Sequence, residues 1–467
     1  MDSTAPSISI SEDGEYAAQL NGKDLIVHLN PASSEFKEVD IVKAKESTSR
    51  FFKFSRPPPV TSTDKRGSGD DGTDRRMLCA SDTRIQVWQL RTLQQCAEIE
   101  NIESGATHID FGGDQNEVIV FHAWNTKLTV FGLDTGRSQV IKTPKSSHPN
   151  SFGYRPRTRQ LAVLLKPDTS DLLTIHEFRT YELINRAILP TLDAQGLKWS
   201  PDGRWIAVWD AASTGTKVLI FTAHGQLFRT YSGPPDSDPV LDLGVKNIEW
   251  SPADRTGTSE YLAVAKVDGN VDILKSKTFT CSASLSHIFH IDQYSPSIWR
   301  ERYTSDGELE YTESSSSSAF SVVEPSSPSR SILTMVFSSD AAFLATVDQT
   351  RSSIVWIWAL EKIPRLVSAL VHEHPVRQVI WHPSAAELLI TTSNSAVAAV
   401  RYLSPDCEPV IVRVPISSEG GRYDAKWVVS SGSRFWIGTP EEYVVGHLSR
   451  EGGTRFELSN SLSRAQL

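Results

Sequence analysis

The sequence predicts an all-β fold assembled from one repeated unit. Nine times, an aromatic or apolar residue ends an expected short strand and is closely followed by a turn built from Ser, Pro, Asp or Gly. These anchor residues are Ile10, Phe54, Phe111, Tyr154, Trp199, Trp250, Phe337, Trp381 and Trp427, with spacings of 44, 57, 43, 45, 51, 87, 44 and 46 residues. A period in the forties with strand-like content is typical of the blades of a WD40-type β-propeller.

Insertions explain the two largest spacings: a polar stretch at 57–76 and a Ser-rich insertion at 287–330, between units six and seven. We therefore expect about nine blades in one ring, although a ring of seven or eight blades or two smaller rings stay possible. The propeller is expected over residues 1–456, followed by a disordered tail at 457–467. The expected units are 7–45, 47–101, 105–145, 148–190, 194–232, 244–286, 331–371, 375–416 and 423–450.

The fifth unit has the clearest strand pattern. Its first expected strand is 196–199, and the turn Ser200-Pro201-Asp202-Gly203 follows, in which Pro fixes φ while Asp and Gly tolerate the reversal. The other three expected strands are 205–209, 217–221 and 227–231. Four short antiparallel strands joined by tight turns make one blade.

The same order recurs in the units that follow. Unit six has strands at 245–250, 261–265 and 271–274, unit seven at 332–337, 343–346 and 354–360, and unit eight at 376–381, 387–391 and 397–402. Units two to four keep the outline more loosely. The two ends look incomplete, so we expect closure by a strand that one terminus lends to the blade begun by the other, because closure removes exposed sheet edges.

Composition limits the classes of partner. The net charge is −9, which argues against nucleic acid as the main partner, because phosphate binding needs a concentrated basic surface. The longest apolar runs are strand-sized, well below the ~20 residues that span a bilayer, so no membrane contact is expected. The N-terminus does not read as a signal peptide, and the four cysteines are far apart without a CxxC pair. We expect reduced thiols in a cytosolic protein.

Catalytic motifs are not apparent. The sequence has no GxGxxG, GxxxxGK[ST], HExxH or GxSxG pattern, so neither a cofactor nor a metal is expected. The histidines at 287, 290, 372, 374 and 382 are better explained as strand-linking hydrogen-bond partners at blade junctions. Large aromatic residues fill the space between blades, and the residues expected to define the blades are Trp199, Asp202, Gly203, Trp209, Asp210, Trp250, Trp356, Trp358 and Trp381.

The insertion holds the candidate contact residues. Its first half is too apolar for a bare linker, and Trp299, Arg300 and Arg302 are the candidates for partner contact. Its second half is Ser-rich and of low complexity. Ser327 precedes a proline there and is a candidate phosphorylation site for a proline-directed mitotic kinase, where a phosphate would change the local charge.

The central part of the chain resembles a known family. Residues 199–203 (WSPDG) and 206–210 (IAVWD) resemble the WD repeat-containing protein eight family of spindle-pole and centrosomal proteins. The resemblance continues at 219–221, 225, 227, 230–232, 245–246, 250–252, 262–264, 268–269, 343–346, 348, 355–358, 375–377 and 381–383. The insertion falls between units six and seven as in that family. Trp209-Asp210 is the most specific element of the resemblance, because it ends the second strand of a blade rather than the third.

The resemblance implies a non-enzymatic scaffold in the cytoplasm, at the spindle pole body or centrosome, that anchors microtubule minus ends. It also implies a coiled-coil partner of the Msd/SSX-interacting type and, through it, a minus-end-directed kinesin. The alternative is an RNA- or ribosome-associated propeller similar to nine-bladed translation-initiation factors. A phosphoinositide-binding propeller has only Phe228-Arg229-Thr230 as a poor match to its paired-arginine motif, and an enzyme lacks an assembled set of catalytic groups.

Overall fold

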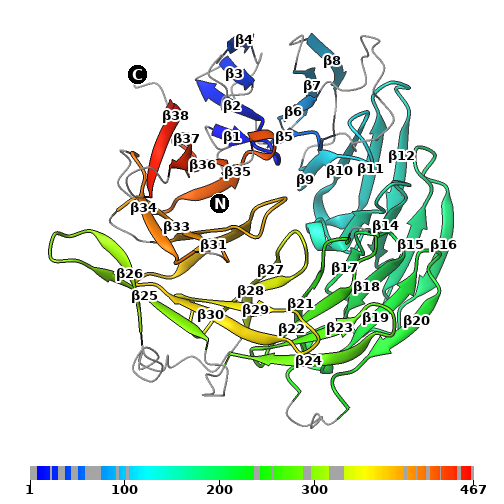
Figure 1. The fold of residues 1–467 in the computed structure, drawn as a ribbon. Coiled ribbons are helices and arrows are strands. Elements are labelled where there is room, and N and C mark those ends of the chain that lie inside the picture. Colours follow the sequence, from blue (N-terminus) through cyan, green and yellow to red (C-terminus); the bar gives the residue numbers. More distant parts are fainter. Residues whose placement is uncertain are drawn as a thin grey trace.

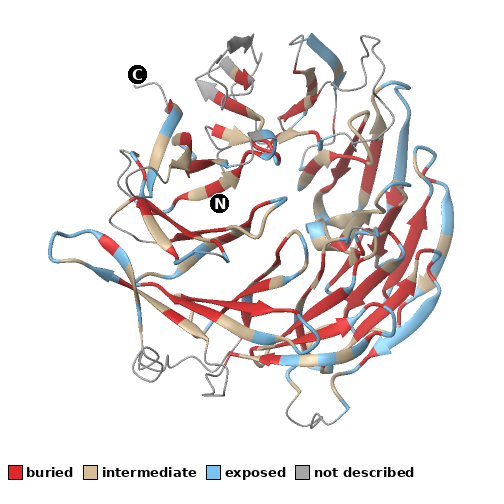
Figure 2. Cartoon of the chain, viewed as in Figure 1, coloured by how far each residue is buried: buried red, intermediate tan, exposed pale blue. Residues whose placement is uncertain are grey.

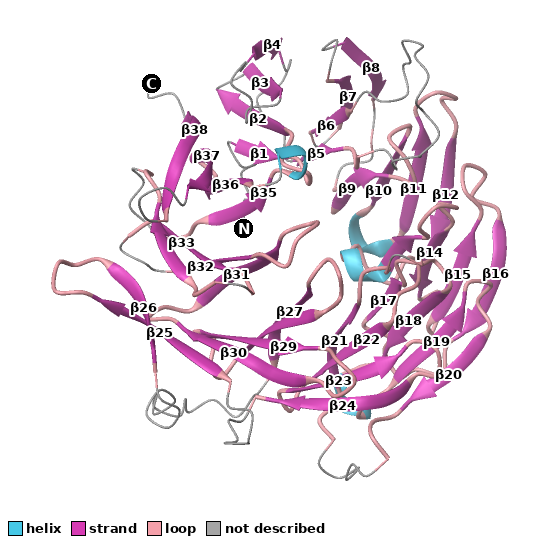
Figure 3. Cartoon of the chain, viewed as in Figure 1, coloured by secondary structure: helices cyan, strands magenta, loops and turns pink. Residues whose placement is uncertain are grey.

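The computed structural model is made almost entirely of β-strands and tight turns (Figure 3). It describes residues 8–21, 24–29, 37–43, 51–57, 75–81, 83–90, 94–100, 102, 105–235, 242–254, 256–287, 296–314, 331–393, 397–405, 407–416, 421–431, 433–449 and 454–463. Within these residues the strands form nine sheets, each built on four consecutive strands. The predicted nine-bladed β-propeller is confirmed.

The blades follow one another in chain order around a ring (Figure 1). Blades one to three comprise β1 (Ile8–Ile10), β2 (Tyr16–Asn21), β3 (Asp24–Leu29), β4 (Lys37–Lys43); β5 (Phe51–Phe54), β6 (Arg76–Ala80), β7 (Ile85–Gln89), β8 (Gln94–Ile99); and β9 (His108–Phe111), β10 (Glu117–Phe121), β11 (Lys127–Gly132), β12 (Ser138–Lys142). Blades four to six comprise β13 (Phe152–Tyr154), β14 (Leu161–Leu165), β15 (Leu172–His176), β16 (Leu183–Ile188); β17 (Gly196–Trp199), β18 (Trp205–Trp209), β19 (Val218–Thr222), β20 (Leu227–Tyr231); and β21 (Val245–Trp250), β22 (Tyr261–Lys266), β23 (Asn270–Lys275), β24 (Thr280–Ser286).

Blades seven to nine complete the ring. They comprise β27 (Ile332–Phe337), β28 (Phe343–Asp348), β29 (Ile354–Ala359), β30 (Arg365–Val371); β31 (Val376–Trp381), β32 (Leu388–Thr392), β33 (Ala399–Leu403), β34 (Val410–Arg413); and β35 (Asp424–Trp427), β36 (Arg434–Thr439), β37 (Glu442–Ser449), β38 (Arg455–Ser463). Short 3-10 turns lie at η2 (Ala123–Asn125), η3 (Pro149–Ser151), η4 (Ala212–Thr214) and η5 (Val429–Ser431). No helix in the described part of the chain is long and apolar enough to cross a membrane.

Burial follows the position of a strand within its blade. In blade five, β18 and β19 are almost wholly buried, whereas only the last residue of the outermost strand, β20, is buried (Figure 2). The second and third strands are covered on both faces because each blade lies between two others. Nine clusters of buried apolar side chains fill the nine seams between adjacent blades. The core is therefore a circle of interfaces rather than one central mass.

Every anchor residue ends the first strand of its blade. Ile10 is the last residue of β1, Trp199 of β17 and Trp427 of β35, and the other six hold the same place in their blades. First strands of neighbouring blades contact one another, as β13 contacts β17 and β27 contacts β31. The ring face on which the first strands end, and on which the third strands also end, is called the anchor face below. The opposite face carries the segments between blades and is called the linker face.

Closure of the ring differs from the expectation. No strand is lent across the junction in the described residues: β1 to β4 form one sheet and β35 to β38 another. The last blade packs side by side against the first (Figure 1), and Ile8 and Ala17 share an apolar cluster with Trp436 and Leu462. The Trp436 indole N–H also donates to the Gly14 carbonyl oxygen at 2.9 Å. Blade nine has its own fourth strand, so it needs none from the N-terminus.

The predicted disordered tail at 457–467 is wrong as far as residue 463. These residues belong to β38, which pairs with β37 from Arg455↔Ser449 to Ser463↔Glu442. The propeller therefore extends past the predicted end at 456. The tail is polar because an outermost strand has one face in water, as β16 and β20 also do.

The insertion is not a loop throughout its length. Residues 296–314 contain a hairpin of β25 (Ser297–Tyr303) and β26 (Leu309–Glu313), and β25 pairs in parallel with β30. The sheet of blade seven thus has six strands in the order β26-β25-β30-β29-β28-β27, and the hairpin extends outward from the ring (Figure 1). Ser327 lies outside the described residues.

Candidate interaction surface

Four of the nine anchors are tryptophans, and each donates its indole N–H to the preceding blade. The acceptors are backbone carbonyl oxygens, at 3.0 Å for Trp199 to Gly153, 3.2 Å for Trp250 to Lys198, 3.1 Å for Trp381 to Val336 and 3.4 Å for Trp427 to Ile380. In each case the acceptor residue directly precedes the anchor of its own blade. These tryptophans therefore link first strands around the ring as well as fill the seams.

The turn after Trp199 is held by a buried serine. Ser200 Oγ accepts the Trp205 N–H at 3.0 Å and donates to Asp202 Oδ1 at 2.5 Å, and Asp202 in turn accepts the Arg204 N–H at 3.0 Å. Gly203 has φ of 71°, in the left-handed region that favours glycine. The sequence-predicted Asp202 and Gly203 thus have a structural part in this turn.

The adjacent residues Trp209 and Asp210, at the end of β18, contact different parts of the ring. The Trp209 side chain is buried in the seam between blades five and six. Asp210 lies on the linker face, where its carboxylate accepts N–H groups of Leu192 and Asp193 from the segment between blades four and five, at 2.8–3.1 Å. Burial acts to raise the pKa of Asp210, but these bonds, another from Ala211 and the charge of Lys217 hold the pKa below its ordinary value.

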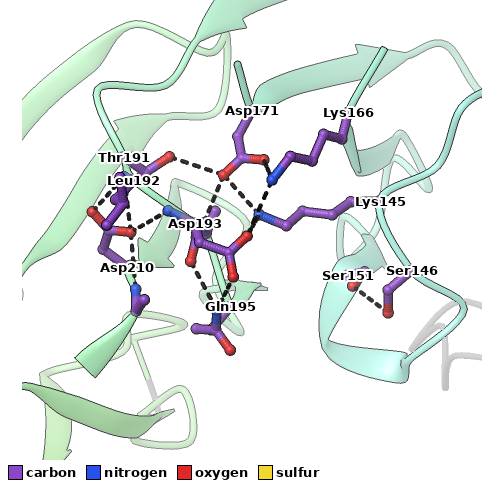
Figure 4. A network of polar contacts seen from close by, with 12 residues as sticks. Lys145, Ser146, Ser151, Lys166, Asp171, Thr191, Leu192, Asp193, Gln195 and Asp210 are labelled. Atoms are coloured by element: carbon purple, nitrogen blue, oxygen red, sulfur yellow. Dashed lines mark hydrogen bonds and ion pairs between the residues drawn. The ribbon is translucent and has the colours of Figure 1, made fainter. Parts of the chain in front are cut away.

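A second carboxylate fixes the same segment (Figure 4). Asp171, which is buried, accepts the Ala194 N–H at 2.6 Å and the Lys145 ammonium at 2.7 Å. Asp193 is 2.8 Å from the same Lys145 ammonium, whose hydrogen bond lowers the pKa of Asp193. Lys145 lies in the segment between blades three and four and Asp193 in the segment between blades four and five, so this network ties both segments to Asp171 of blade four.

Trp356 and Trp358 lie on β29 in the seam between blades six and seven. His287, the residue at the start of the insertion, meets both indoles edge-on at ring-centroid distances of 5.6 Å. Its Nε2 and the Trp358 indole N–H both bond to Thr346 Oγ1, at 2.7 and 2.9 Å. The histidine links two blades by hydrogen bonds.

The insertion hairpin is fixed to blade eight by a buried ion pair. Glu301 on β25 and Arg401 on β33 are almost completely buried, with Glu301 Oε1 2.6 Å from Arg401 NH2. Next to this pair, the Tyr311 hydroxyl donates to His372 Nε2 at 2.8 Å, while His372 Nδ1 donates to the Ser353 carbonyl oxygen at 2.9 Å. Burial, with a further contribution from Arg401, lowers the pKa of His372 to about 4. The hairpin is thus an integral part of the ring wall.

The structure does not bring the three candidate contact residues together. Trp299 faces blade eight, on the same side of β25 as Glu301, whereas Arg300 and Arg302 fall on the other side by strand alternation. Trp299 forms part of the wall of an apolar pocket of about 390 Å³ between blades seven and eight. The other walls include Phe343, Trp381, Leu403 and the turn after β33.

A second pocket of about 450 Å³ lies between blades eight and nine, and the anchor Trp427 lines it. Cys407 and Glu408, in the turn between β33 and β34, line both pockets, so this turn forms a ridge between them. Glu387 adds a second carboxylate to the second pocket. The two pockets and the ridge, on the anchor face, are called the blade-eight surface below.

Comparison with known proteins agrees with this architecture. The chain is 26% identical over 366 residues to WD repeat-containing protein WRAP73 of Mus musculus, covering 73% of the chain and 76% of the mouse protein. The repeat unit and the blades match that description. The chain is a WD repeat protein. It is also 25% identical over 282 residues to the uncharacterized WD repeat-containing protein C32H8.09 of Schizosaccharomyces pombe (strain 972 / ATCC 24843), covering 59% of this chain and 55% of that protein.

No family model matches this WD repeat protein. A solved structure, KlHsv2 with loop 6CD replaced by a Gly-Ser linker, aligns to it with a TM-score of 0.40 and 11% sequence identity. That alignment covers 77% of the chain and 99% of the KlHsv2 chain. A likeness this low supports no argument about function.

Sequence reasoning missed the residues that lock the hairpin in this WD repeat protein. Glu301 and Arg401 are 100 positions apart, and their pairing depends on where β25 docks. One signal was available. Arg401 interrupts the apolar third strand of blade eight, and an arginine at a buried position implies a buried acidic partner. No comparable sequence signal marks Leu403 and Glu408 as residues that line the blade-eight surface.

Structural surroundings account for the Cys79 thiol and for the Arg155 and Arg159 side chains of this WD repeat protein. In the described ranges, no group of three or more His, Cys, Asp or Glu side chains is placed to hold a metal ion. Burial raises the pKa of the Cys79 thiol to about 12, so this cysteine stays protonated and unreactive. The basic side chains of Arg155 and Arg159 are engaged between blades, by Gly203 and by Asp114.

Proposed function

We propose that this WD repeat protein is a non-enzymatic scaffold at the spindle pole body or centrosome. In this role it anchors microtubule minus ends and supports spindle assembly. It does so by holding a coiled-coil partner of the Msd/SSX-interacting type, which joins it to a minus-end-directed kinesin. It works in the cytoplasm, at the cytoskeleton.

Two kinds of support bear on this proposal. The resemblance of residues 196–383 to spindle-pole proteins supports the proposed location at the spindle pole body or centrosome. The similarity to WRAP73, which covers 73% of the chain, is consistent with a common WD repeat family. The observation that carries the scaffold role is the docked hairpin. A buried ion pair fixes it beside a formed apolar pocket, with Trp299 as one wall. Such a surface can receive a partner segment with little rearrangement, which favours binding.

The test is an affinity purification from mitotic cells with the intact protein and with Trp299→Ala. Ile363→Ala is the matched control, because Ile363 is an exposed apolar residue in the same ring and lines neither pocket. We expect a coiled-coil spindle-pole protein and a kinesin with the intact protein and the control. Point variants are preferable to removal of 287–330, because β25 belongs to the sheet of blade seven.

Each outcome has a clear meaning. Loss of these partners with Trp299→Ala alone, while thermal melting shows a folded ring, supports the scaffold role and its location at the hairpin. Recovery with both variants keeps the scaffold role but moves the contact elsewhere. Recovery of ribosomal subunits without spindle proteins contradicts the proposal and favours the ribosome-associated alternative.

A further inference from the structure

We infer that the blade-eight surface binds an extended peptide segment that carries bulky apolar side chains next to lysine or arginine. The inference rests on the proposed scaffold function and adds the place and the chemistry of the partner contact. The pocket walls, the charge at the ridge and the rigidity of the hairpin support it.

The first pocket has the form of a socket for an apolar side chain. Phe343 and Trp381 stack with ring centroids 6.1 Å apart and planes inclined by 20°, and they line the pocket together with Ile357 and Leu403. Trp299 is one of its walls. Its volume of about 390 Å³ falls in the range of sites that bind small ligands and side chains. Apolar walls of this kind stabilise a bound Leu, Phe or Trp side chain by removing apolar area from water.

The second pocket places another site on the far side of the ridge. Trp427, Val410 and Leu448 supply its apolar lining, and the His382 ring meets the Trp427 ring edge-on at 4.6 Å. Because both pockets share Cys407 and Glu408, a single segment that crosses the ridge enters both. An extended chain suits this arrangement, since its alternate side chains point the same way.

Charge favours a basic segment. Glu408 lines both pockets and Glu387 lines the second, while no Lys or Arg is among the described residues that line either one. Both glutamates are partly or fully accessible to solvent. A lysine or arginine beside the apolar side chain therefore meets complementary charge, whereas a nucleic-acid backbone or an acidic segment meets repulsion.

The surface is held in its binding shape before a partner arrives. The Glu301–Arg401 pair and the Tyr311–His372 hydrogen bond fix the hairpin against blades seven and eight, and so fix Trp299. Arg413 NH2 also donates to the Gly307 carbonyl oxygen in the hairpin turn at 2.7 Å. Rigid walls reduce the entropy lost on binding, so a short segment suffices for measurable affinity.

The test measures fluorescence anisotropy of labelled synthetic peptides with the full-length protein. The first peptide has Leu and Phe between Lys and Arg residues, the second replaces Lys and Arg with Glu, and the third replaces Leu and Phe with Ser. A labelled oligouridine serves as the RNA probe. We expect the first peptide to bind at least about tenfold more tightly than the other three probes.

Variants locate the binding. Trp299→Ala and Leu403→Asp are expected to weaken binding of the first peptide about tenfold, and Glu408→Lys to weaken it while strengthening binding of the acidic peptide. The matched controls are Ile363→Asp and Glu361→Lys, at exposed positions that line neither pocket. If the first two variants do not fold, Glu408→Lys carries the test alone, because Glu408 is exposed.

Equal binding of all three peptides, tighter binding of oligouridine, or unchanged affinity in a folded Glu408→Lys protein overturns the inference. A benzophenone-bearing form of the first peptide gives an independent check, because its cross-links must map to the hairpin, to residues 403–405 or to Cys407 and Glu408. Since the assay uses purified protein, a negative result leaves the spindle-pole location open. Recovery of the partners from cells with every variant would likewise keep the proposed function while moving the contact away from this surface.

Discussion

Trp209 shows at the residue scale how much one side chain contributes to a seam. It is 1% exposed and packs in the seam between blades five and six, and its ring lies so close to Gly196 that a β-carbon there would clash with it. We expect Trp209→Ala to lower the free energy of unfolding by about 3–5 kcal/mol, as truncation of large buried aromatics does. Urea unfolding followed by circular dichroism measures the change.

The matched control for this substitution is Trp124→Ala, because Trp124 is 94% exposed. Its effect should be within about 0.5 kcal/mol, as for surface substitutions in general. Similar stability losses for the two variants would place Trp209 outside the core.

The Glu301–Arg401 pair makes a different residue-scale prediction. Glu301→Gln leaves the Arg401 charge buried without its counter-ion, so we expect a loss of about 3–5 kcal/mol. The double variant Glu301→Leu, Arg401→Met should recover most of that loss, since no charge stays buried. Asp424→Asn is the control, because Asp424 pairs with Arg377 at a solvent-accessible site, where such pairs contribute about 1 kcal/mol or less. A double variant less stable than Glu301→Gln would contradict this explanation.

His372 predicts a pH dependence of stability. Burial lowers its pKa from 6.5 to about 4 in the folded protein, so between these pH values the unfolded chain binds more protons than the folded one. The free energy of unfolding therefore falls as the pH drops from 6.5 to 4, by up to about 3 kcal/mol from this histidine. His372→Gln should make the fall shallower, whereas the exposed His224→Gln should not. Parallel stability–pH curves for wild type and His372→Gln would contradict the assignment.

At the residue scale, the sequence predicted the structural features that depend on residues nearby in the chain. The Ser200–Gly203 turn follows from local backbone preferences, so its residues could be named in advance. The functions of Glu301, His372 and Leu403 depend on partners in other blades, and no local pattern encodes those distances. Trp299 was singled out for its position in the insertion, but its separation from Arg300 and Arg302 depends on the strand alternation of β25, which only the structure shows.

At the scale of elements, the four anchor tryptophans link blades five, six, eight and nine to the blades before them. Trp381→Phe keeps an aromatic ring in the seam but removes the indole N–H donor to Val336, so we expect a loss of about 0.5–1.5 kcal/mol. Trp381→Ala removes the ring as well and should cost about 3–5 kcal/mol. Thermal melting of both variants tests the separation of the two effects. Equal losses would mean that the ring packing contributes nothing beyond the hydrogen bond.

Some strands are easier to predict from the sequence than others. The first three strands of most blades are apolar and bounded by turns, so their positions follow from the chain alone. Outermost strands such as β38 have one face in water, so their sequences resemble a polar tail. This explains the wrong prediction of a disordered tail at 457–467. The hairpin escaped prediction for another reason: β25 pairs in parallel with β30, which lies about seventy residues further along the chain.

At the scale of the whole molecule, each blade is complete in itself. The sheets of blades one and nine each contain four strands from one end of the chain, and side-chain packing with a few hydrogen bonds joins them. We therefore expect a circular permutant that opens between Tyr231 and Val245, with the natural ends joined by a Gly-Ser linker, to fold into the same ring. Circular dichroism, gel filtration and thermal melting check this. A permutant that aggregates or melts far below the wild type would show that chain order around the ring matters.

Closure by packing has a mechanical consequence. Seven of the nine junctions between blades are bridged only by a short covalent segment and one by the longer insertion, while the junction of blades nine and one has no covalent bridge. Tension applied through the two ends of the chain acts directly on that junction, and resistance comes from side-chain packing and a few hydrogen bonds such as that of Trp436. Tension applied through blade eight acts instead across junctions that the backbone also ties together. A propeller closed in this way therefore withstands more force when both attachments lie on blades rather than at the ends of the chain.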